Sequence, residues 1–98
     1  MIHVHIDLYH IAVQGHAPRP EGVPPNQNIV CAAVSALTLT LIEGLRAIAG
    51  MEIQVCEQSG YIRISWEEAN DIGKALIDTW YIGIMRIRDS YDNTITIV

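Results

Sequence analysis

Basic residues and cysteine are both scarce in this sequence. The 98 residues include six basic against eleven acidic side chains, a formal net charge of −5, and only two cysteines. Nucleic-acid binding normally needs a basic patch, so we expect no nucleic-acid partner. The cysteines, Cys31 and Cys56, are too few for a disulfide framework, so we expect a cytoplasmic chain without a signal peptide. The uncharged stretch at residues 26–42 is short and begins with polar residues, so we expect no membrane span.

The proportion of charged residues, acidic and basic together, is also low. Only 17% of the residues are charged and 50% are hydrophobic, whereas an ordinary soluble domain has about a quarter charged. A chain of this length forms one domain, here residues 1–98, and buries a modest core when alone. The surplus of apolar residues therefore predicts a homodimer. The negative charge would suit a basic peptide partner.

Proline is absent from the chain except in one segment. All four prolines lie between residues 18 and 25, close to Gly22. Such a segment can be neither a helix nor a central strand, so residues 17–27 are predicted to be a loop. It acts either as a semi-rigid lid over a neighbouring site or as a plain connector, and the sequence leaves both interpretations open.

The first residues alternate between apolar and polar, which predicts a half-buried strand from residue 2. The apolar phase shifts by one residue near Asp7, and this predicts a bent strand or an irregular hairpin. His3, His5 and Asp7 fall on one face. We interpret this face as the solvent side of the strand, and expect neither a metal site nor a cofactor.

Residues 29–49 have a helical pattern that ends at Gly50. Cys31 would lie in the first turn, where free backbone N–H groups can lower a thiol pKa from about 8.5 to roughly 3.5–7.5. No residue between 31 and 42 is charged, so the helix is expected to be buried on all sides. Ser35, one turn on, either supports the thiol or bonds back to a helix carbonyl.

The second half predicts two strands, a helix and a last strand. Residues 51–56 and 61–65 form a hairpin, and Ser65 and Glu68 form a capping box that opens a helix to about residue 91. Cys56 is interpreted as a structural residue that reacts slowly. The final strand covers residues 94–98. The fold class is therefore α+β, with two apolar helices sandwiched against small antiparallel β-sheets. The expected apolar stripe of the second helix comprises Ala69, Ile72, Leu76, Trp80, Ile84 and Ile87.

Two short motifs, GHA at residues 15–17 and IVCAAVS at residues 29–35, resemble the ribosomal-processing cysteine protease family, Prp. The resemblance implies that His16 and Cys31 are the catalytic pair, that Gly15, Ala17 and Gly22 belong to the loop around it, and that the chain forms a homodimer. It also implies a peptide substrate, the N-terminal extension of a large-subunit ribosomal protein. Such a Cys-His pair would need no cofactor.

Asn28 stands where the family has an acidic residue. It can still cap the helix and support the site, but it carries no charge. Two alternatives therefore stay open beside the ribosomal protease. The chain is either a weakened or inactive dimeric scaffold that binds peptides, or a phage-encoded protease acting on a virion protein.

Overall fold

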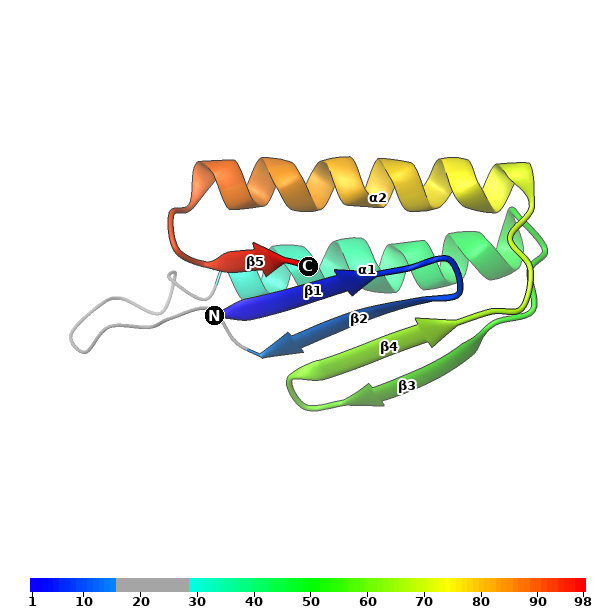
Figure 1. The fold of residues 1–98 in the computed structure, drawn as a ribbon, viewed down its shortest axis with the longest axis horizontal. Coiled ribbons are helices and arrows are strands. Elements are labelled where there is room, and N and C mark those ends of the chain that lie inside the picture. The colour runs from blue at the N-terminus through cyan, green and yellow to red at the C-terminus, as the bar shows by residue number, and fades with distance from the viewer. Residues whose placement is uncertain (16–28) are drawn as a thin grey trace.

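The structure is a computed structural model that describes residues 1–15 and 29–98. His16, Ala17, Gly22 and Asn28, with the loop predicted at 17–27, lie outside the described residues. The described chain forms one five-stranded sheet and two α-helices (Figure 1). The elements are β1 (Ile2–Ile6), β2 (His10–Gly15), α1 (Ile29–Ala47), β3 (Gln54–Gln58), β4 (Tyr61–Ser65), α2 (Asp71–Ser90) and β5 (Ile95–Ile97).

The strand order in the sheet is β3-β4-β2-β1-β5. Neighbouring strands are antiparallel except the first and last strands of the chain, β1 and β5, which are parallel. The α+β class is confirmed. The strands form a single mixed sheet, where the sequence predicts small antiparallel sheets.

Both helices cover the same face of the sheet. They run antiparallel to each other, and the sheet lies along them (Figure 1). The inward side chains are apolar and nearly inaccessible, while their neighbours along each strand, such as His3, His5 and Arg63, are exposed. One face of the sheet therefore holds the core, and the other is open in the described part of this chain. The buried strand residues are Ile2, Val4, Ile11, Val13, Ile64 and Ile95.

The first two strands form a true hairpin, which explains the shift in apolar phase. Ile6 pairs with Ile11 and Val4 with Val13. The inward-facing residues therefore have even numbers on β1 and odd numbers on β2. Asp7 closes the turn, because its Oδ1 accepts the backbone N–H groups of Tyr9 and His10, both at 2.8 Å. The irregular-hairpin alternative is thus the one the structure adopts.

Helix α1 is buried on one side only, so the expectation of burial all round is wrong. Its face toward the sheet is apolar, apart from Thr38, and buried, but Ile29 and Leu39 are 51% and 41% exposed. Ala32 and Ala36 are also exposed. These four exposed side chains are uncharged, so composition could not separate them from the buried ones. The buried residues of α1 are Val30, Val34, Thr38, Leu41, Ile42 and Leu45.

Helix α1 is longer than the uncharged stretch from which no membrane span was expected. The helix continues past residue 42 to Ala47, and by length and composition alone it is apolar enough to cross a membrane, with a mean hydropathy of 1.7. The core helix of a soluble protein passes the same test, and so does a signal sequence near the N-terminus. Packing within the described fold buries 33% of this apolar window.

The capping box predicted at Ser65 does not open a helix. Ser65 is still paired with His10 in the sheet, and the N–H of Trp66 donates to Tyr9 at 2.9 Å. Helix α2 begins six residues later, where Asn70 is the N-cap and its Oδ1 accepts the N–H of Gly73 at 2.8 Å. Sheet pairing has therefore overridden a local helix signal.

Two smaller expectations also need correction. Strand β3 both starts and ends later than predicted, and because it ends at Gln58 the hairpin turn is the two residues Ser59 and Gly60. In the predicted apolar stripe of α2, Trp80 and Ile84 are buried but Ile72 is 52% exposed. Ile72 lies in the first turn of α2, where the next residue, Gly73, is the one that faces the core.

One hydrogen bond joins the two helices inside the core. Trp80 Nε1 donates to Thr38 Oγ1 at 3.1 Å, and the same hydroxyl donates to the carbonyl of Val34 at 2.7 Å. Thr38 is fully buried and Trp80 is 3% exposed. The Thr38 hydroxyl thus provides a hydrogen-bond acceptor for an indole N–H that is buried away from water.

Thr38→Val should destabilise the protein by about 1–3 kcal/mol, because it leaves the indole N–H of Trp80 buried without its acceptor. Thr40→Val is the matched control, since Thr40 makes the same bond back to a helix carbonyl, that of Ala36 at 2.7 Å, but is exposed. Its effect should stay within about 0.5 kcal/mol. Urea unfolding of both variants measures the difference, and equal midpoints would show that the helix-to-helix bond contributes nothing.

Candidate active site

Cys31 is the third residue of α1 and lies at the end of the molecule where β2 finishes (Figure 1). It is half-buried, and its side chain packs against the core. A residue in the first helical turn is surrounded by backbone N–H groups that have no partner within the helix. The prediction that this cysteine lies in a first helical turn is confirmed.

A small hollow of about 160 Å³ opens beside Cys31. Its described wall comes from the first turns of α1, the start of β1, the end of β2 and the β3–β4 hairpin. Gly15 contributes to its wall, so the residue next to His16 in the chain borders the same hollow as the thiol. Ser35 also lines it, one turn along α1, together with Leu39.

The structure therefore brings together Cys31, Ser35 and Gly15 of the predicted site. His16, Ala17, Gly22 and Asn28 lie outside the described residues. Cys56 does not line the hollow, and it is exposed on β3 instead of being a shielded structural residue. Cys56 pairs with the exposed Arg63 and lies on the face of the sheet away from the helices, whereas its expected slow reaction stays a prediction.

Sequence reasoning missed the contribution of the β3–β4 hairpin. Glu57, Gln58, Gly60 and Tyr61 all line the hollow. They arrive there through strand pairing, because the N–H of Gly15 donates to the carbonyl of Gly60 at 2.8 Å. No local motif marks these residues. Glu57 adds a negative charge to the wall that a basic side chain could meet.

This arrangement suits acyl transfer. A thiol at a helix start can attack a carbonyl carbon, and nearby backbone N–H groups can hold the oxygen that becomes negative in the transition state. Strand ends border the hollow, and an extended peptide could reach it by lying beside them. The described residues of the hollow include no set of three metal ligands.

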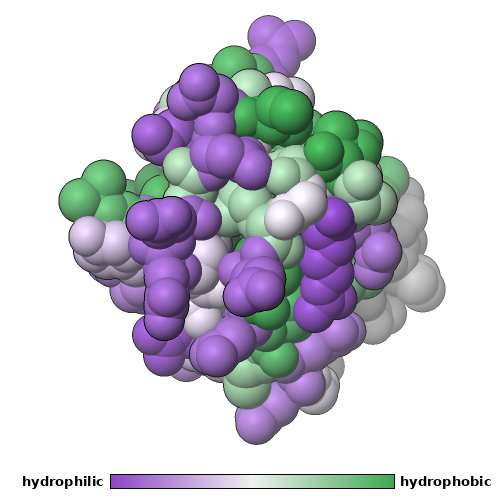
Figure 2. Space-filling model, turned by 90° about the vertical axis from the view of Figure 1, so that its right-hand side faces the viewer, coloured by the Kyte–Doolittle hydropathy of each residue, from purple (hydrophilic) through white to green (hydrophobic). Residues whose placement is uncertain are grey.

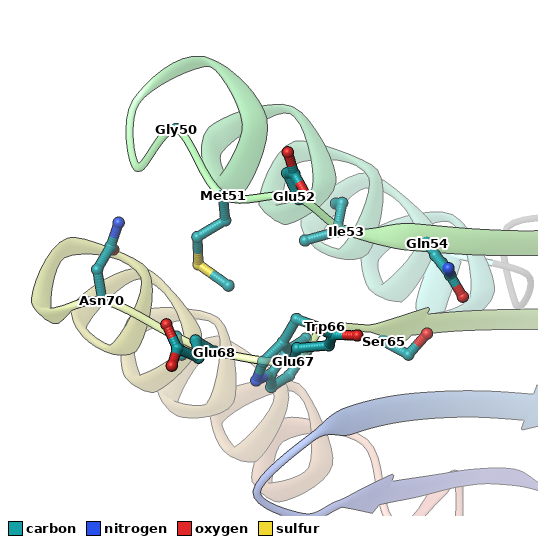
Figure 3. Close-up of a pocket in the computed structure, with 11 residues that line it drawn as sticks. Gly50, Met51, Glu52, Ile53, Gln54, Ser65, Trp66, Glu67, Glu68 and Asn70 are labelled. Atoms are coloured by element: carbon teal, nitrogen blue, oxygen red, sulfur yellow. The ribbon is translucent and has the colours of Figure 1, made fainter.

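A larger depression of about 950 Å³ lies at the opposite end of the molecule. Figure 3 shows it between the segment after α1 and the segment before α2, with the Met51 side chain pointing into the space between them. Its wall includes Trp66 and the acidic residues Glu52, Glu67 and Glu68. Its described lining residues include no cysteine or histidine, so the smaller hollow beside Cys31 is the candidate active site although it is not the largest.

Several solved structures share this fold. A structure of the ribosomal processing protease Prp from S. aureus with a covalently linked product peptide matches with a TM-score of 0.85 and 21% identity, covering 99% of this chain and 97% of that one. Another, with a substrate peptide, gives 0.81 and 16%, covering 99% and 95%. SMU.848 from Streptococcus mutans gives 0.73 and 23%, with the same coverage.

At these identities the likeness establishes the fold. A search of curated protein sequences found no significant match. The family comparison is decisive, because the family model described as cysteine protease Prp matches residues 1–96, which is nearly the whole chain. Its extent includes all of α1, the first four strands and the first two residues of β5. This chain therefore belongs to the cysteine protease Prp family.

Proposed function

We propose that this protein is a thiol endopeptidase that cleaves the N-terminal extension of a ribosomal protein or a related protein substrate. The observation that carries the proposal is the position of Cys31, in the first turn of α1 and in the wall of the hollow, in a chain of a cysteine protease family.

In the proposed reaction the sulfur of Cys31 attacks the scissile carbonyl carbon, and the thiol proton passes to His16. The peptide C–N bond then breaks, and His16 returns the proton to the leaving amine. Water hydrolyses the thioester that remains and regenerates the thiol. Backbone N–H groups of the first turn of α1 stabilise the oxyanion in both steps.

The assignment of His16 is supported by the motif around it and by its neighbour in the chain. Gly15 ends β2 and borders the hollow that contains Cys31. The chain between Gly15 and Ile29 thus starts and finishes at β2 and α1, two of the elements that border the hollow. Ser35 supports the site from the next turn of α1.

A peptide is the proposed partner. The two S. aureus structures contain a substrate peptide and a product peptide, and the hollow of this chain ends at the strands of an exposed hairpin. Glu57 in its wall and the net charge of −5 favour a substrate with basic residues near the cleaved bond. Neither the thiol nor the imidazole in this mechanism requires a cofactor. We propose a cytoplasmic location, where the thiol stays reduced.

Peptide cleavage followed by mass spectrometry tests the proposal. The panel should contain the N-terminal regions of large-subunit ribosomal proteins and of proteins encoded beside this gene. Cleavage of a ribosomal peptide supports a ribosomal role, and cleavage of a virion protein alone favours a phage protease. If the folded protein and its Asn28→Asp variant cut nothing, the scaffold interpretation replaces the enzyme.

A homodimer is also part of the proposal. The exposed stripe of α1 formed by Ile29, Ala32, Ala36 and Leu39 carries no charge, and its small side chains would allow a second copy of the same helix to approach closely. Burial of this stripe would account for the low charge content of the chain.

Light scattering should therefore report about twice the chain mass of 10.9 kDa. Ala36→Glu should shift the protein toward the monomer, because it places a charge in the centre of the stripe. Ile82→Glu is the control, since Ile82 is an exposed isoleucine on α2, outside the stripe, with 57% accessibility. A monomer at all micromolar concentrations contradicts the dimer, and disruption by Ile82→Glu alone would place the interface on α2.

A further inference from the structure

Two histidines and one aspartate meet at the turn of the β1–β2 hairpin. His10 Nδ1 lies 2.8 Å from Asp7 Oδ2, and His5 Nε2 lies 3.6 Å from the same oxygen. The two imidazole rings are 5.0 Å apart between centroids. The three ligand atoms all lie within 4.8 Å of one another.

The register of the sheet explains why these residues meet. His5 lies on the solvent face of β1, and His10 lies on the same face at the start of β2. Asp7 begins the turn between them. The sequence suggested His3 as the companion of His5 and Asp7, but strand pairing brings His10 instead.

The turn that carries the cluster is held by hydrogen bonds on both sides. Within it, Asp7 Oδ1 accepts two backbone N–H groups, and the N–H of Asp7 donates to the carbonyl of His10 at 3.0 Å. From outside, the backbone N–H and the indole Nε1 of the buried Trp66 donate to the carbonyls of Tyr9 and Leu8, at 2.9 and 3.0 Å. The three side chains therefore start from a fixed backbone.

The two oxygens of the Asp7 carboxylate have different partners. Oδ1 is used by the turn, so Oδ2 faces the two imidazoles. The N–H of Tyr9 lowers the pKa of Asp7, and the N–H of His10 acts in the same direction. The carboxylate is therefore ionised at neutral pH, and its ligand oxygen is oriented by backbone donors in the way that outer partners orient metal ligands.

We propose that His5 Nε2, Asp7 Oδ2 and His10 Nδ1 bind one divalent transition-metal ion of the zinc class. Imidazole nitrogen and carboxylate oxygen are ligands that zinc accepts, at about 2.0–2.2 Å in tetrahedral geometry. That geometry separates neighbouring ligand atoms by roughly 3.4 Å; the two distances to Asp7 Oδ2 are 2.8 and 3.6 Å, and all three atoms lie within 4.8 Å of one another. Water completes the coordination, because His5 and Asp7 are 46% and 42% exposed.

The site is separate from the thiol. Cys31 lies where β2 ends, whereas this cluster lies where β2 begins, at the opposite end of the sheet (Figure 1). Figure 2 looks onto that opposite end of the molecule and shows hydrophilic and hydrophobic residues intermingled there. A bound ion would cross-link β1, the turn and β2, and it would stabilise the hairpin without taking part in peptide cleavage.

Calorimetric titration of ZnCl₂ into the full chain carrying His16→Ala and Cys31→Ala tests the site, because this background removes the proposed catalytic pair. We expect one ion per chain. His5→Ala and His10→Ala should each weaken binding at least about tenfold. Asp7→Asn should weaken it too, while keeping an acceptor for the turn. His3→Ala is the matched control and should bind like the parent.

NMR of the parent chain gives a second measurement that does not depend on the stability of a variant. The ring signals of His5 and His10 should shift on adding zinc, and those of His3 should not. The proposal is overturned if zinc binding disappears in the His16→Ala, Cys31→Ala background, if His3→Ala weakens binding as much as His10→Ala, or if all three ring signals move together.

Discussion

Cys31→Ala should abolish peptide cleavage, lowering the rate at least about 10⁴-fold. The proposed reaction passes through a bond between the sulfur and the substrate carbonyl carbon, and a methyl side chain cannot form it. Loss of a nucleophile in proteases of this general kind removes nearly all catalysis beyond binding and oxyanion stabilisation. The variant should still fold, because Cys31 is only half-buried and alanine favours a helix.

The second cysteine provides the control. Cys56 is exposed on β3 and does not line the hollow, so Cys56→Ala should retain full activity. It also leaves Cys31 as the only thiol of the chain, so that inactivation by iodoacetamide must follow alkylation of Cys31 in the intact mass. Cleavage that persists in Cys31→Ala, or that is lost equally in Cys56→Ala, would refute the assignment of the nucleophile.

Local signals in the sequence were sufficient for α1 and for the start of the site. Asn28 and the uncharged run after it predict a helix near residue 29, and α1 begins at Ile29. Gly50 was expected to end the helix, and it has a φ of 65° three residues after Ala47. The position of Cys31 in the first turn follows from these signals alone.

Features that depend on strand pairing were not predictable in the same way. Ser65 and Glu68 have the spacing of a capping box, yet Ser65 pairs with His10, fifty-five positions earlier in the chain. The backbone of Ser65 is already hydrogen-bonded within the sheet, so α2 begins only after the N-cap residue Asn70. Nothing near Ser65 in the sequence reports this partner.

The same limit applies to both sites. Glu57 and Tyr61 reach the hollow because β4 pairs with β2, and His10 replaces His3 in the cluster because β2 folds back on β1. The local environment of a single residue, such as Cys31 at a helix start, could be predicted from its neighbours in the sequence. The companions of that residue depend on register, which a two-residue periodicity leaves open.

Gly15→Ala should lower the free energy of unfolding by roughly 1–3 kcal/mol from backbone strain alone, because Gly15 has a φ of 100°. A Cβ at this position would also meet the carbonyl oxygen of Met1 at a distance that real side chains do not show. That oxygen belongs to the backbone, and Ile2 pairs with Gly15 in the sheet. Relief therefore requires the end of β2 to move away from β1.

Gly50→Ala separates the two effects. Gly50 also has a positive φ, 65°, but nothing lies within 4 Å of a Cβ built on it. Its cost should be only that of a left-handed residue, about 1–2 kcal/mol. Urea unfolding at equal protein concentrations measures both variants, and equal losses would show that the close approach to Met1 has no energetic consequence. If Gly15→Ala costs more, as expected, the same movement displaces a wall of the hollow beside Cys31. Cleavage by this variant should then fall by more than its folded fraction, whereas Gly50→Ala should keep the activity of its folded fraction.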